Sequence, residues 1–294
     1  MVPAIRTEAL TRSYGAVLAL DRLDLEVAQG EIFGFLGPNG AGKTTTIRIL
    51  LDLIRPDAGR AQVMGFDCQL QSVEARRSCG YLAGEFRTWP GLTGRATVEL
   101  LASMRGSDAA AMHTYAERLR LDLDRKAGEY SKGNRQKLGV LLALLGSPSV
   151  LLLDEPTSGL DPILQREVHA ILQEKAAEGV TVFFSSHVMS EVEQVCHRVG
   201  VLRQGKLIAV DEIEDLKAKG VRHVTVRFHG QAPAELHVPG ARILRQNAAT
   251  VEFEVAGEMD ALLKALAQHR VVDLETSQPT LDEILLGYYE EART

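Results

Sequence analysis

EIFGFLGPNGAGKTTTIRIL, residues 31–50, decides the fold of this chain. The run IFGFL at 32–36 is short and apolar, which predicts a strand buried at the centre of a sheet. Apolar side chains at helical spacing over 44–54, followed by Pro56, predict a helix that ends before the proline. Between them, GPNGAGKT at 37–44 fits GxxxxGK[ST] in the strand–loop–helix context that this pattern requires. These residues predict an α/β fold built around a phosphate-binding loop.

The glycine-rich loop is expected to hold the phosphates of a nucleotide. Its glycines let backbone N–H groups converge on phosphate oxygens, and the start of the following helix adds partial positive charge. Lys43 is expected to reach the β- and γ-phosphates, and Thr44 to ligate Mg²⁺. A glycine-rich turn without function is the alternative, and the flanking strand and helix argue against it. The residues predicted to bind nucleotide here are Gly37, Pro38, Asn39, Gly40, Ala41, Gly42, Lys43, Thr44 and Thr45.

Two further buried strands are predicted to bring polar residues to the same edge of the sheet. VLLLDE at 150–155 is a continuous apolar run that ends in Asp154 and Glu155, and open α/β sheets bind ligands at such strand ends. We expect Asp154 to hold the Mg²⁺ and Glu155 to polarise an attacking water molecule. His187 ends a second apolar run, VTVFFSSH at 180–187, where its imidazole can meet a γ-phosphate. The alternatives are acids that only solvate a loop and a structural histidine.

Strands alternate with helices along most of the chain, which predicts a P-loop core with a mainly parallel sheet. Residues 1–30 have a half-buried strand pattern and are expected to form an antiparallel β part, and residues from about 85 to 145 a helical subdomain. Composition changes near Lys219–Gly220, so we expect an ATPase domain over 1–219 and a small α+β domain over 220–294. Helices are expected there over EMDALLKALAQ (258–268) and LDEILLGYYEE (281–291).

The bulk composition argues against several classes of protein. The 294 residues carry a formal net charge of −6, so nucleic acid is a poor match for the surface as a whole. Three cysteines without paired spacing suit a reducing compartment. The longest apolar region, 138–153, is interrupted by Gly146-Ser147-Pro148, whereas a membrane span needs roughly 20 apolar residues. We therefore expect a chain that is soluble by itself and reaches a membrane only through a partner.

Over residues 1–215 the chain resembles the nucleotide-binding subunits of ABC transporters. GPNGAGKT matches their Walker A motif, LLLDEP at 151–156 their Walker B motif with its following glutamate, and His187 their switch histidine. Ser158-Gly159-Leu160-Asp161 matches their D-loop, which implies that Asp161 belongs to the nucleotide-binding set. The resemblance also implies that Tyr14 stacks on adenine, with a packed strand-end tyrosine as the alternative.

The same resemblance explains Tyr130-Ser131-Lys132-Gly133-Asn134, which stands where the family has its signature segment, LSGGQ. In the family this segment caps the γ-phosphate held by the opposite subunit, so two chains arranged head to tail complete two ATP sites. A serine hydroxyl, a glycine N–H and a helix N-terminus suit a terminal phosphate. The resemblance thus adds Ser131, Gly133 and Asn134 to the nucleotide-binding residues. A solvated basic helix start is the alternative.

Two segments depart from the family pattern. Tyr130, Lys132 and Asn134 replace leucine, glycine and glutamine, and we expect function to survive because the added charge lies near an anion. Gly84 falls at the place of the Q-loop glutamine, and Glu85 follows it. A carboxylate can ligate Mg²⁺ or orient water, so Glu85 is expected to substitute as a further metal ligand.

The resemblance implies an ATP-binding and hydrolysing subunit of an ABC exporter, with ATP and Mg²⁺ as cofactors. YSKGNRQKLG (130–139), GYLAGEF (80–86) and the β-rich C-terminal part are similar to the ATPases paired with ABC-2-type permeases. The implied partners are such a membrane permease and a second ATPase subunit, expected to form a homodimer, and nucleic acid is not a partner. The implied location is cytoplasmic, peripheral on the inner face of the cell membrane. Trp89 is either a core residue or an exposed anchor for the permease.

Two other functions share the phosphate loop. A soluble ABC-type ATPase acting in DNA repair or translation usually carries a long coiled coil or a duplicated cassette, and the sequence has neither. A GTPase should carry an NKxD-type motif to read guanine, which the sequence lacks, and a P-loop kinase would not need the signature segment. The C-terminal domain is expected to provide a dimer contact, to regulate the cycle or only to pack.

Overall fold

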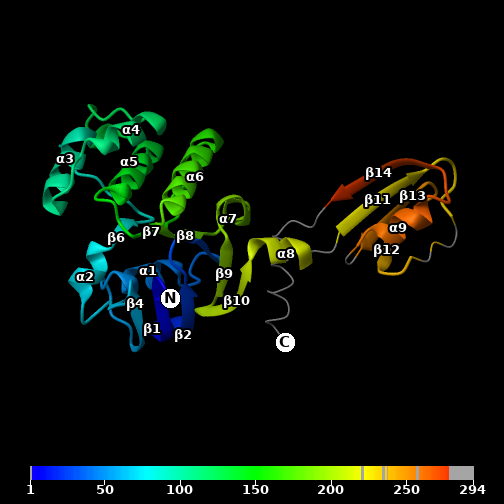
Figure 1. Ribbon diagram of the computed structural model, residues 1–294, viewed down its shortest axis with the longest axis horizontal. Helices are drawn as coiled ribbons and strands as arrows, with labels where there is room; N and C mark the ends of the chain where they lie inside the picture. The colour runs from blue at the N-terminus through cyan, green and yellow to red at the C-terminus, as the bar shows by residue number, and fades with distance from the viewer. Residues whose placement is uncertain (1, 220–221, 234–235, 237, 256–257, 278–294) are drawn as a thin grey trace. The chain divides into compact units, whose positions relative to one another are not determined.

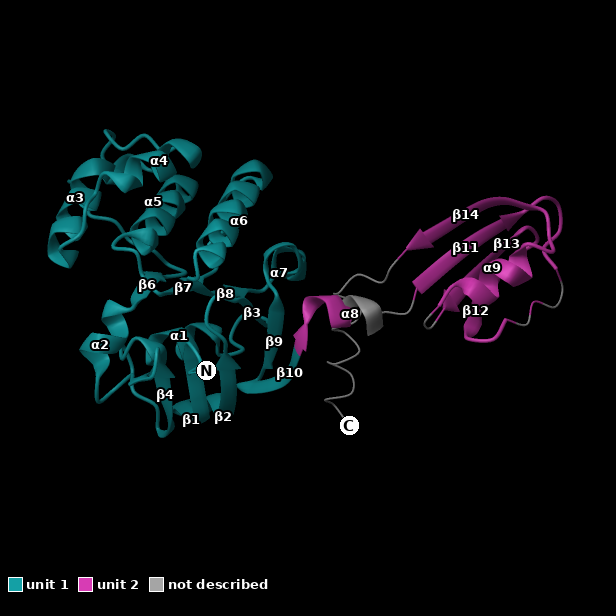
Figure 2. Ribbon diagram, viewed as in Figure 1, with its two compact units in different colours: residues 1–210 teal, residues 211–294 magenta. Residues whose placement is uncertain are grey.

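The computed structural model describes residues 2–219, 222–233, 236, 238–255 and 258–277 (Figure 1). The chain divides into two compact units, residues 1–210 and 211–294 (Figure 2). The composition change near Lys219–Gly220 thus lies inside the second unit, directly after the helix α8 (Ile213–Lys219). None of the described helices is long and apolar enough to cross a membrane.

The first unit is built on a six-stranded sheet in the order β10-β9-β3-β8-β7-β6. Strand β3 pairs in parallel with β8 and β9, and β7 pairs in parallel with β6 and β8. Every residue of β3, β7 and β8 is buried, which agrees with the continuous apolar runs that predicted these strands. Their carboxyl ends therefore meet at one edge. The strands are β3 (Ile32–Leu36), β6 (Cys79–Leu82), β7 (Val150–Asp154), β8 (Thr181–Ser186), β9 (Arg198–Arg203) and β10 (Lys206–Glu212).

A smaller antiparallel sheet in the order β2-β1-β4-β5 packs on the same core. In β2 the residues Leu23, Leu25 and Val27 are buried while the two acids between them are exposed, as their alternation predicts. Leu20 and Leu23 belong to one apolar cluster with residues of the central sheet. The strands are β1 (Ile5–Tyr14), β2 (Val17–Val27), β4 (Ala58–Val63) and β5 (Phe66–Asp67).

The helix after the glycine loop, α1 (Lys43–Leu50), ends four residues before the end predicted from its apolar spacing. Asp52 adopts a left-handed φ of 52°, its N–H bonds to the Ile49 carbonyl, and the N–H of Leu53 bonds to the Arg48 carbonyl. These two bonds form a Schellman motif, which satisfies the last carbonyls and stops the helix. The prediction that Pro56 sets the end was wrong, because the local backbone closes the helix first.

The helical part lies beside β6 and β7 (Figure 1). Helix α5 packs directly on β6, and two glycines permit this: a Cβ at Gly80 would lie 1.9 Å from the Ala143 carbonyl oxygen, and one at Gly139 would lie 2.4 Å from Leu82 Cδ1. The other helices of this unit are α2 (Ser72–Arg77), α3 (Gly94–Arg105), α4 (Ala111–Arg118), α5 (Lys132–Leu144), α6 (Pro162–Ala177) and α7 (Met189–Val195), with a 3₁₀ turn at Ala127–Glu129.

The second unit contains a four-stranded antiparallel sheet in the order β12-β13-β11-β14 and the helix α9 (Asp260–Leu266). Its core joins buried valines and phenylalanines of the sheet to Leu262 and Leu266 of α9. The fold class predicted from the sequence is confirmed. The helix predicted over 281–291 lies outside the described residues. The strands are β11 (Arg222–Phe228), β12 (Ala241–Gln246), β13 (Thr250–Val255) and β14 (Val271–Ser277).

The cysteine thiols are predicted to be unreactive in the folded protein. Cys68, Cys79 and Cys196 are at most 7% exposed, and burial raises the pKa of Cys68 and of Cys79 to about 12. Because the thiolate is the reactive form, we expect a thiol-specific disulfide reagent to label the native protein roughly 100-fold more slowly than the unfolded protein. Fast labelling of any one thiol without denaturant would contradict this packing.

Candidate nucleotide site

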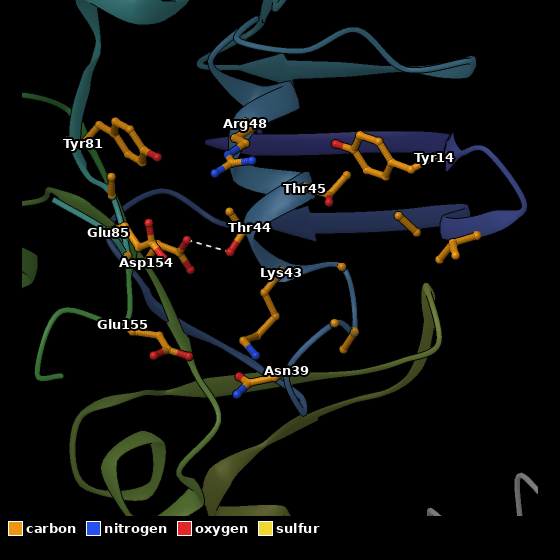
Figure 3. A pocket seen from close by; sticks show the side chains of 17 residues that line it. Tyr14, Asn39, Lys43, Thr44, Thr45, Arg48, Tyr81, Glu85, Asp154 and Glu155 are labelled. Carbon is orange, nitrogen blue, oxygen red and sulfur yellow. Dashed lines mark hydrogen bonds between the residues drawn. The ribbon is translucent and has the colours of Figure 1, made fainter. Parts of the chain in front are cut away.

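A cavity of about 540 Å³ lies at the carboxyl edge of the central sheet (Figure 3). Residues from β1, β2, the glycine loop, α1, the segment after β6 and the end of β7 form its walls. Two basic and three acidic side chains face it, so an anionic ligand entering this cavity is best accommodated together with a cation. The lining residues are Tyr14, Val17, Ala19, Asn39, Gly40, Ala41, Gly42, Lys43, Thr44, Thr45, Arg48, Tyr81, Ala83, Gly84, Glu85, Asp154 and Glu155.

The glycine loop needs its glycines for two separate reasons. Gly40 and Gly42 have φ values of 81° and 115°, a region that residues with a Cβ rarely adopt. In addition, a Cβ at Gly42 would lie 2.5 Å from the carbonyl oxygen of Ala19 on β2. The loop can therefore turn tightly against the small sheet and present its backbone to the cavity. Of the predicted loop residues, Gly37 and Pro38 do not line the cavity but contribute carbonyl groups to the loop interior.

Lys43 is the buried cation of the loop. It is only 5% exposed, and its ammonium group donates hydrogen bonds to the carbonyls of Gly37 and Pro38. Burial lowers the pKa of Lys43, and the nearby carboxylates of Glu155 and Asp154 act in the opposite direction. A lysine removed from water in this way gains most from a ligand that carries concentrated negative charge.

Asp154 is held from two sides at the end of β7. Its Oδ2 accepts a hydrogen bond from Thr44 Oγ1 at 2.7 Å, and its Oδ1 accepts one from Ser185 Oγ at 2.6 Å. Hydroxyl and carboxylate oxygens are the ligands that Mg²⁺ prefers. No group of three or more histidine, cysteine, aspartate and glutamate residues with metal-binding geometry occurs among the described residues. The Thr44 hydroxyl and the Asp154 carboxylate are oxygen donors of the kind that would suit a magnesium ion.

Gly84 and Glu85 lie beside this pair. A Cβ at Gly84 would be 3.2 Å from Asp154 Oδ2, so a side chain at position 84 would point at the Thr44–Asp154 pair. Glycine provides no such side chain, whereas the exposed carboxylate of Glu85 lines the same cavity (Figure 3). The structure thus brings Glu85, Thr44 and Asp154 to one cavity wall.

Glu155 and His187 face each other across neighbouring strand ends. His187 Nδ1 lies 2.9 Å from Glu155 Oε1. Glu155 has a left-handed φ of 52°, which is uncommon for a residue with a side chain, and two contacts hold it there. Its N–H bonds to the Ser185 carbonyl at 3.1 Å, and its carbonyl accepts from Gln136 Nε2 at 2.9 Å. Glu155 lines both the main cavity and a second one of about 230 Å³, which His187 also lines.

Tyr14 marks the opposite end of the cavity from the acidic residues (Figure 3). The tyrosine ends β1 and is 44% exposed, so its ring is not a packed core residue. The Arg12 guanidinium lies 5.0 Å from the ring centroid, on one face. An aromatic face at one end of the cavity and the lysine and carboxylates at the other match the base and the phosphates of a nucleotide.

The signature segment lies outside this cavity. Ser131 caps α5, its hydroxyl accepting the N–H of Asn134 at 3.2 Å, and Lys132 Nζ lies 3.3 Å from Ser158 Oγ in the D-loop. A Cβ at Gly133 would be 3.0 Å from the Gly159 carbonyl oxygen, so the two segments touch. Ser131, Gly133 and Asn134 do not line the main cavity. The cradle and the signature segment of one chain therefore do not form a single site.

The signature region exposes fewer positive side chains than the sequence suggests. Lys137 is only 7% exposed and donates to the Arg120 carbonyl, and Arg135 donates to the Tyr130 carbonyl at 2.6 Å. Only Lys132 is an exposed cation at this helix start. Tyr130, in the place of the family's leucine, is buried, and its hydroxyl donates to the Asp122 carbonyl at 2.6 Å.

Asp161 caps a helix in addition to being part of the D-loop. Its carboxylate accepts hydrogen bonds from the N–H groups of Ile163 and Leu164, both at 3.0 Å, and so caps α6. Asp161 does not line the main cavity.

Sequence reasoning missed four residues of the site. Arg48 and Tyr81 line the cavity, Ser185 bonds to Asp154, and Gln136 bonds to Glu155. The serine at the end of a buried strand was a visible signal, because a polar side chain there faces the ligand edge. No sequence spacing connects Gln136 to Glu155, since only the packing of α5 brings them together.

The fold and the site define a class of protein: a P-loop ATPase whose nucleotide cavity opens at the carboxyl edge of a parallel sheet. A family model described as ABC transporter matches residues 20–158. The bacitracin transport ATP-binding protein of Bacillus licheniformis is 37% identical to this chain over 80% of this chain and 78% of its own length. The chain belongs to the ABC transporter ATP-binding family.

Two further comparisons agree with this assignment. The daunorubicin resistance ATP-binding protein DrrA3 of Streptomyces coeruleorubidus is 35% identical over 96% of this chain and 95% of its own length. A solved dimeric bacterial ABC transporter cassette shares the fold, with a TM-score of 0.66 and 22% identity over 71% of this chain and 98% of that one. The predicted family, the binding of ATP and the activity as an ATPase are confirmed.

Replacing Lys43 by alanine is predicted to weaken ATP binding about 10- to 100-fold, because a charge-assisted contact to phosphate is lost. Equilibrium binding of a fluorescent ATP analogue would measure this. Lys264→Ala is the matched control, since Lys264 is an exposed lysine in the second unit. Equal affinity of the wild type and Lys43→Ala would contradict the assignment of the cradle.

Proposed function

We propose that this chain powers export through a separate membrane permease of the ABC-2 type, as a homodimer located peripherally on the cytoplasmic face of the membrane. One observation carries the proposal: the triphosphate cradle and the signature segment of one chain lie at different places, so a second chain would be needed to complete each site. The names of the two bacterial relatives concern bacitracin transport and daunorubicin resistance, which favours export of a drug-like cargo over DNA repair or translation.

Within one chain, the loop from Gly37 to Thr45 would wrap the phosphates and Tyr14 would stack on the adenine. Lys43 would contact the β- and γ-phosphates, since it is the buried cation at the phosphate end. A magnesium ion would be held by Thr44 and Asp154, whose oxygens already meet at 2.7 Å, with Glu85 as a further ligand from the same wall. When bound, the ion supplies charge neutralisation for the phosphates.

Hydrolysis would use the pair formed by Glu155 and His187. Glu155 lies at the phosphate end of the cavity and would orient and polarise the attacking water. His187, 2.9 Å from that carboxylate, would hold it in place and approach the γ-phosphate. The fixed backbone of Glu155 means that little reorganisation is needed at the moment of reaction.

The second chain would supply Ser131, Gly133 and Asn134 to the γ-phosphate. The Ser131 hydroxyl and the N-terminus of the 13-residue helix α5 are suited to an anion. Asp161 would keep the D-loop at this dimer face by capping α6. A solved cassette of the same fold is dimeric, which supports pairing of two such chains. ATP would then favour the closed dimer because it contacts both chains only in that state.

The permease would meet the first unit near Trp89. This tryptophan is 49% exposed, which favours an exposed anchor for the permease over a core residue. A groove of about 600 Å³ between α2 and the end of α3 offers a further surface, with Met104 75% exposed and Arg76, Arg77 and Arg105 on its walls. Aromatic and arginine side chains are the anchors that protein interfaces favour.

Glu155→Gln is predicted to form a stable dimer in Mg²⁺ and ATP, with turnover reduced at least about 100-fold, because the water loses its base while ATP contacts persist. Size-exclusion chromatography with light scattering would measure the mass. Glu178→Gln, at an exposed position at the end of α6, is the control and should behave as the wild type does. A Glu155→Gln chain that stays monomeric with ATP bound would contradict the dimer model.

Ser131→Arg is predicted to leave ATP binding within about twofold of the wild type and to abolish hydrolysis, since the defect acts on the other chain's nucleotide. Mixing Ser131→Arg with Lys43→Ala tests the head-to-tail arrangement directly. Only a mixed dimer contains one intact cradle facing one intact signature segment, so the mixture should regain part of the ATPase rate. A mixture as inactive as its two components would show that the segment serves its own chain.

A further inference from the structure

Glu191, on α7, connects the loop after β7 to the end of β8. Its Oε1 accepts a hydrogen bond from Thr157 Oγ1 at 2.7 Å, and its Oε2 accepts one from Ser186 Oγ at 2.8 Å. Glu191 is partly buried and lines the second cavity of about 230 Å³. A single carboxylate thus connects the loop after β7 to the last residue of β8.

The two hydroxyl partners lie next to the reactive pair. Thr157 follows Glu155 by two residues, and Ser186 directly precedes His187. Ser186 Oγ also accepts the N–H of Val188 at 2.9 Å, so the Glu191 bond extends to the backbone on the far side of His187. The Glu191 bridge therefore adds a second connection between these segments, beside the direct contact of Glu155 with His187.

We propose that Glu191 is a positioning residue for ATP hydrolysis, holding the Glu155 loop and the His187 loop at the distance the reaction needs. The inference rests on the proposed function of the Glu155–His187 pair. Misplacement of a reacting group by about 1 Å can cost roughly 100-fold in rate, whereas ATP binding depends on the other end of the site. Glu191 contributes no atom to the main cavity, which separates its role from that of Glu155.

The alternative is that Glu191 only stabilises the fold around α7. His169 on α6 also interacts with Glu191: burial lowers the pKa of His169, while Glu191 acts in the opposite direction. A purely structural carboxylate would lower stability and all activities together. A positioning carboxylate would lower the rate of hydrolysis alone, and only while His187 is present.

The first test compares Glu191→Ala, Glu191→Gln and the control Ser190→Ala, an exposed neighbour on the same helix. We expect Glu191→Ala to lower kcat roughly 10- to 100-fold with the Kd for ATP within about twofold. Glu191→Gln can still bond to both hydroxyls and should recover most of the rate. Unchanged kcat in Glu191→Ala would overturn the proposal, and so would a Glu191→Gln chain as slow as Glu155→Gln, because Glu191 would then act chemically.

A double-mutant cycle decides whether the effect passes through His187. In single-turnover experiments on the full chain, Glu191→Ala should change the rate less than about twofold when His187→Ala is already present. Equal effects of Glu191→Ala in both backgrounds would overturn the positioning role and leave a structural one.

Hydrogen exchange gives a readout that does not need ATPase activity. Glu191→Ala should speed exchange of the Val188 amide, whose acceptor Ser186 Oγ loses its anchor, and Ser190→Ala should not. Unaltered protection of this amide would overturn the bridge. If the wild type and Ser190→Ala hydrolyse no ATP, the proposed function fails, and this measurement still decides the bridge by itself.

Discussion

The carboxylate of Asp154 joins three segments that are far apart in the sequence, and the rest of the site depends on it. It accepts from Thr44 at the start of α1 and from Ser185 at the end of β8, while it ends β7 itself. A carboxylate that is 3% exposed is stable only with such partners, because burying an unpaired charge is costly. These bonds fix the distance between the phosphate loop and the strand ends, and with it the distance from Lys43 to Glu155.

Both basic and acidic side chains line the nucleotide cavity. Lys43 and Arg48 face Glu85, Asp154 and Glu155 across the same space. The acidic side chains repel bare phosphate, so the cavity suits a triphosphate that arrives with a divalent cation. The signature segment adds only one exposed cation, Lys132, because Lys137 turns inward. Recognition at that face therefore depends more on the Ser131 hydroxyl and the helix start than on net charge.

The changes from the family pattern have local physical consequences. Tyr130 occupies a leucine position with its ring buried and places its hydroxyl on the Asp122 carbonyl, so the substitution keeps the packing and satisfies the added polar group. Gly84 has no side chain to approach Asp154, whereas the carboxylate of the neighbouring Glu85 lines the same cavity. With the first change Ser131 still caps α5, whereas the second places a carboxylate beside the proposed metal position.

The sequence by itself determined the P-loop, the three fully buried strands and the family, because strict spacing in GPNGAGKT and continuous apolar runs have few other physical explanations. The sequence could not predict where α1 ends, because the left-handed backbone of Asp52 decides it. Nor could it predict that the Lys137 side chain turns inward and donates to the Arg120 carbonyl. The sequence could not pair Gln136 with Glu155 or Glu191 with Thr157, since these partners lie 19 and 34 residues apart along the chain and meet only after α5 and α7 pack on the sheet. Periodicity records which face of an element is buried, whereas the pairing of polar groups across loops is decided by tertiary packing alone.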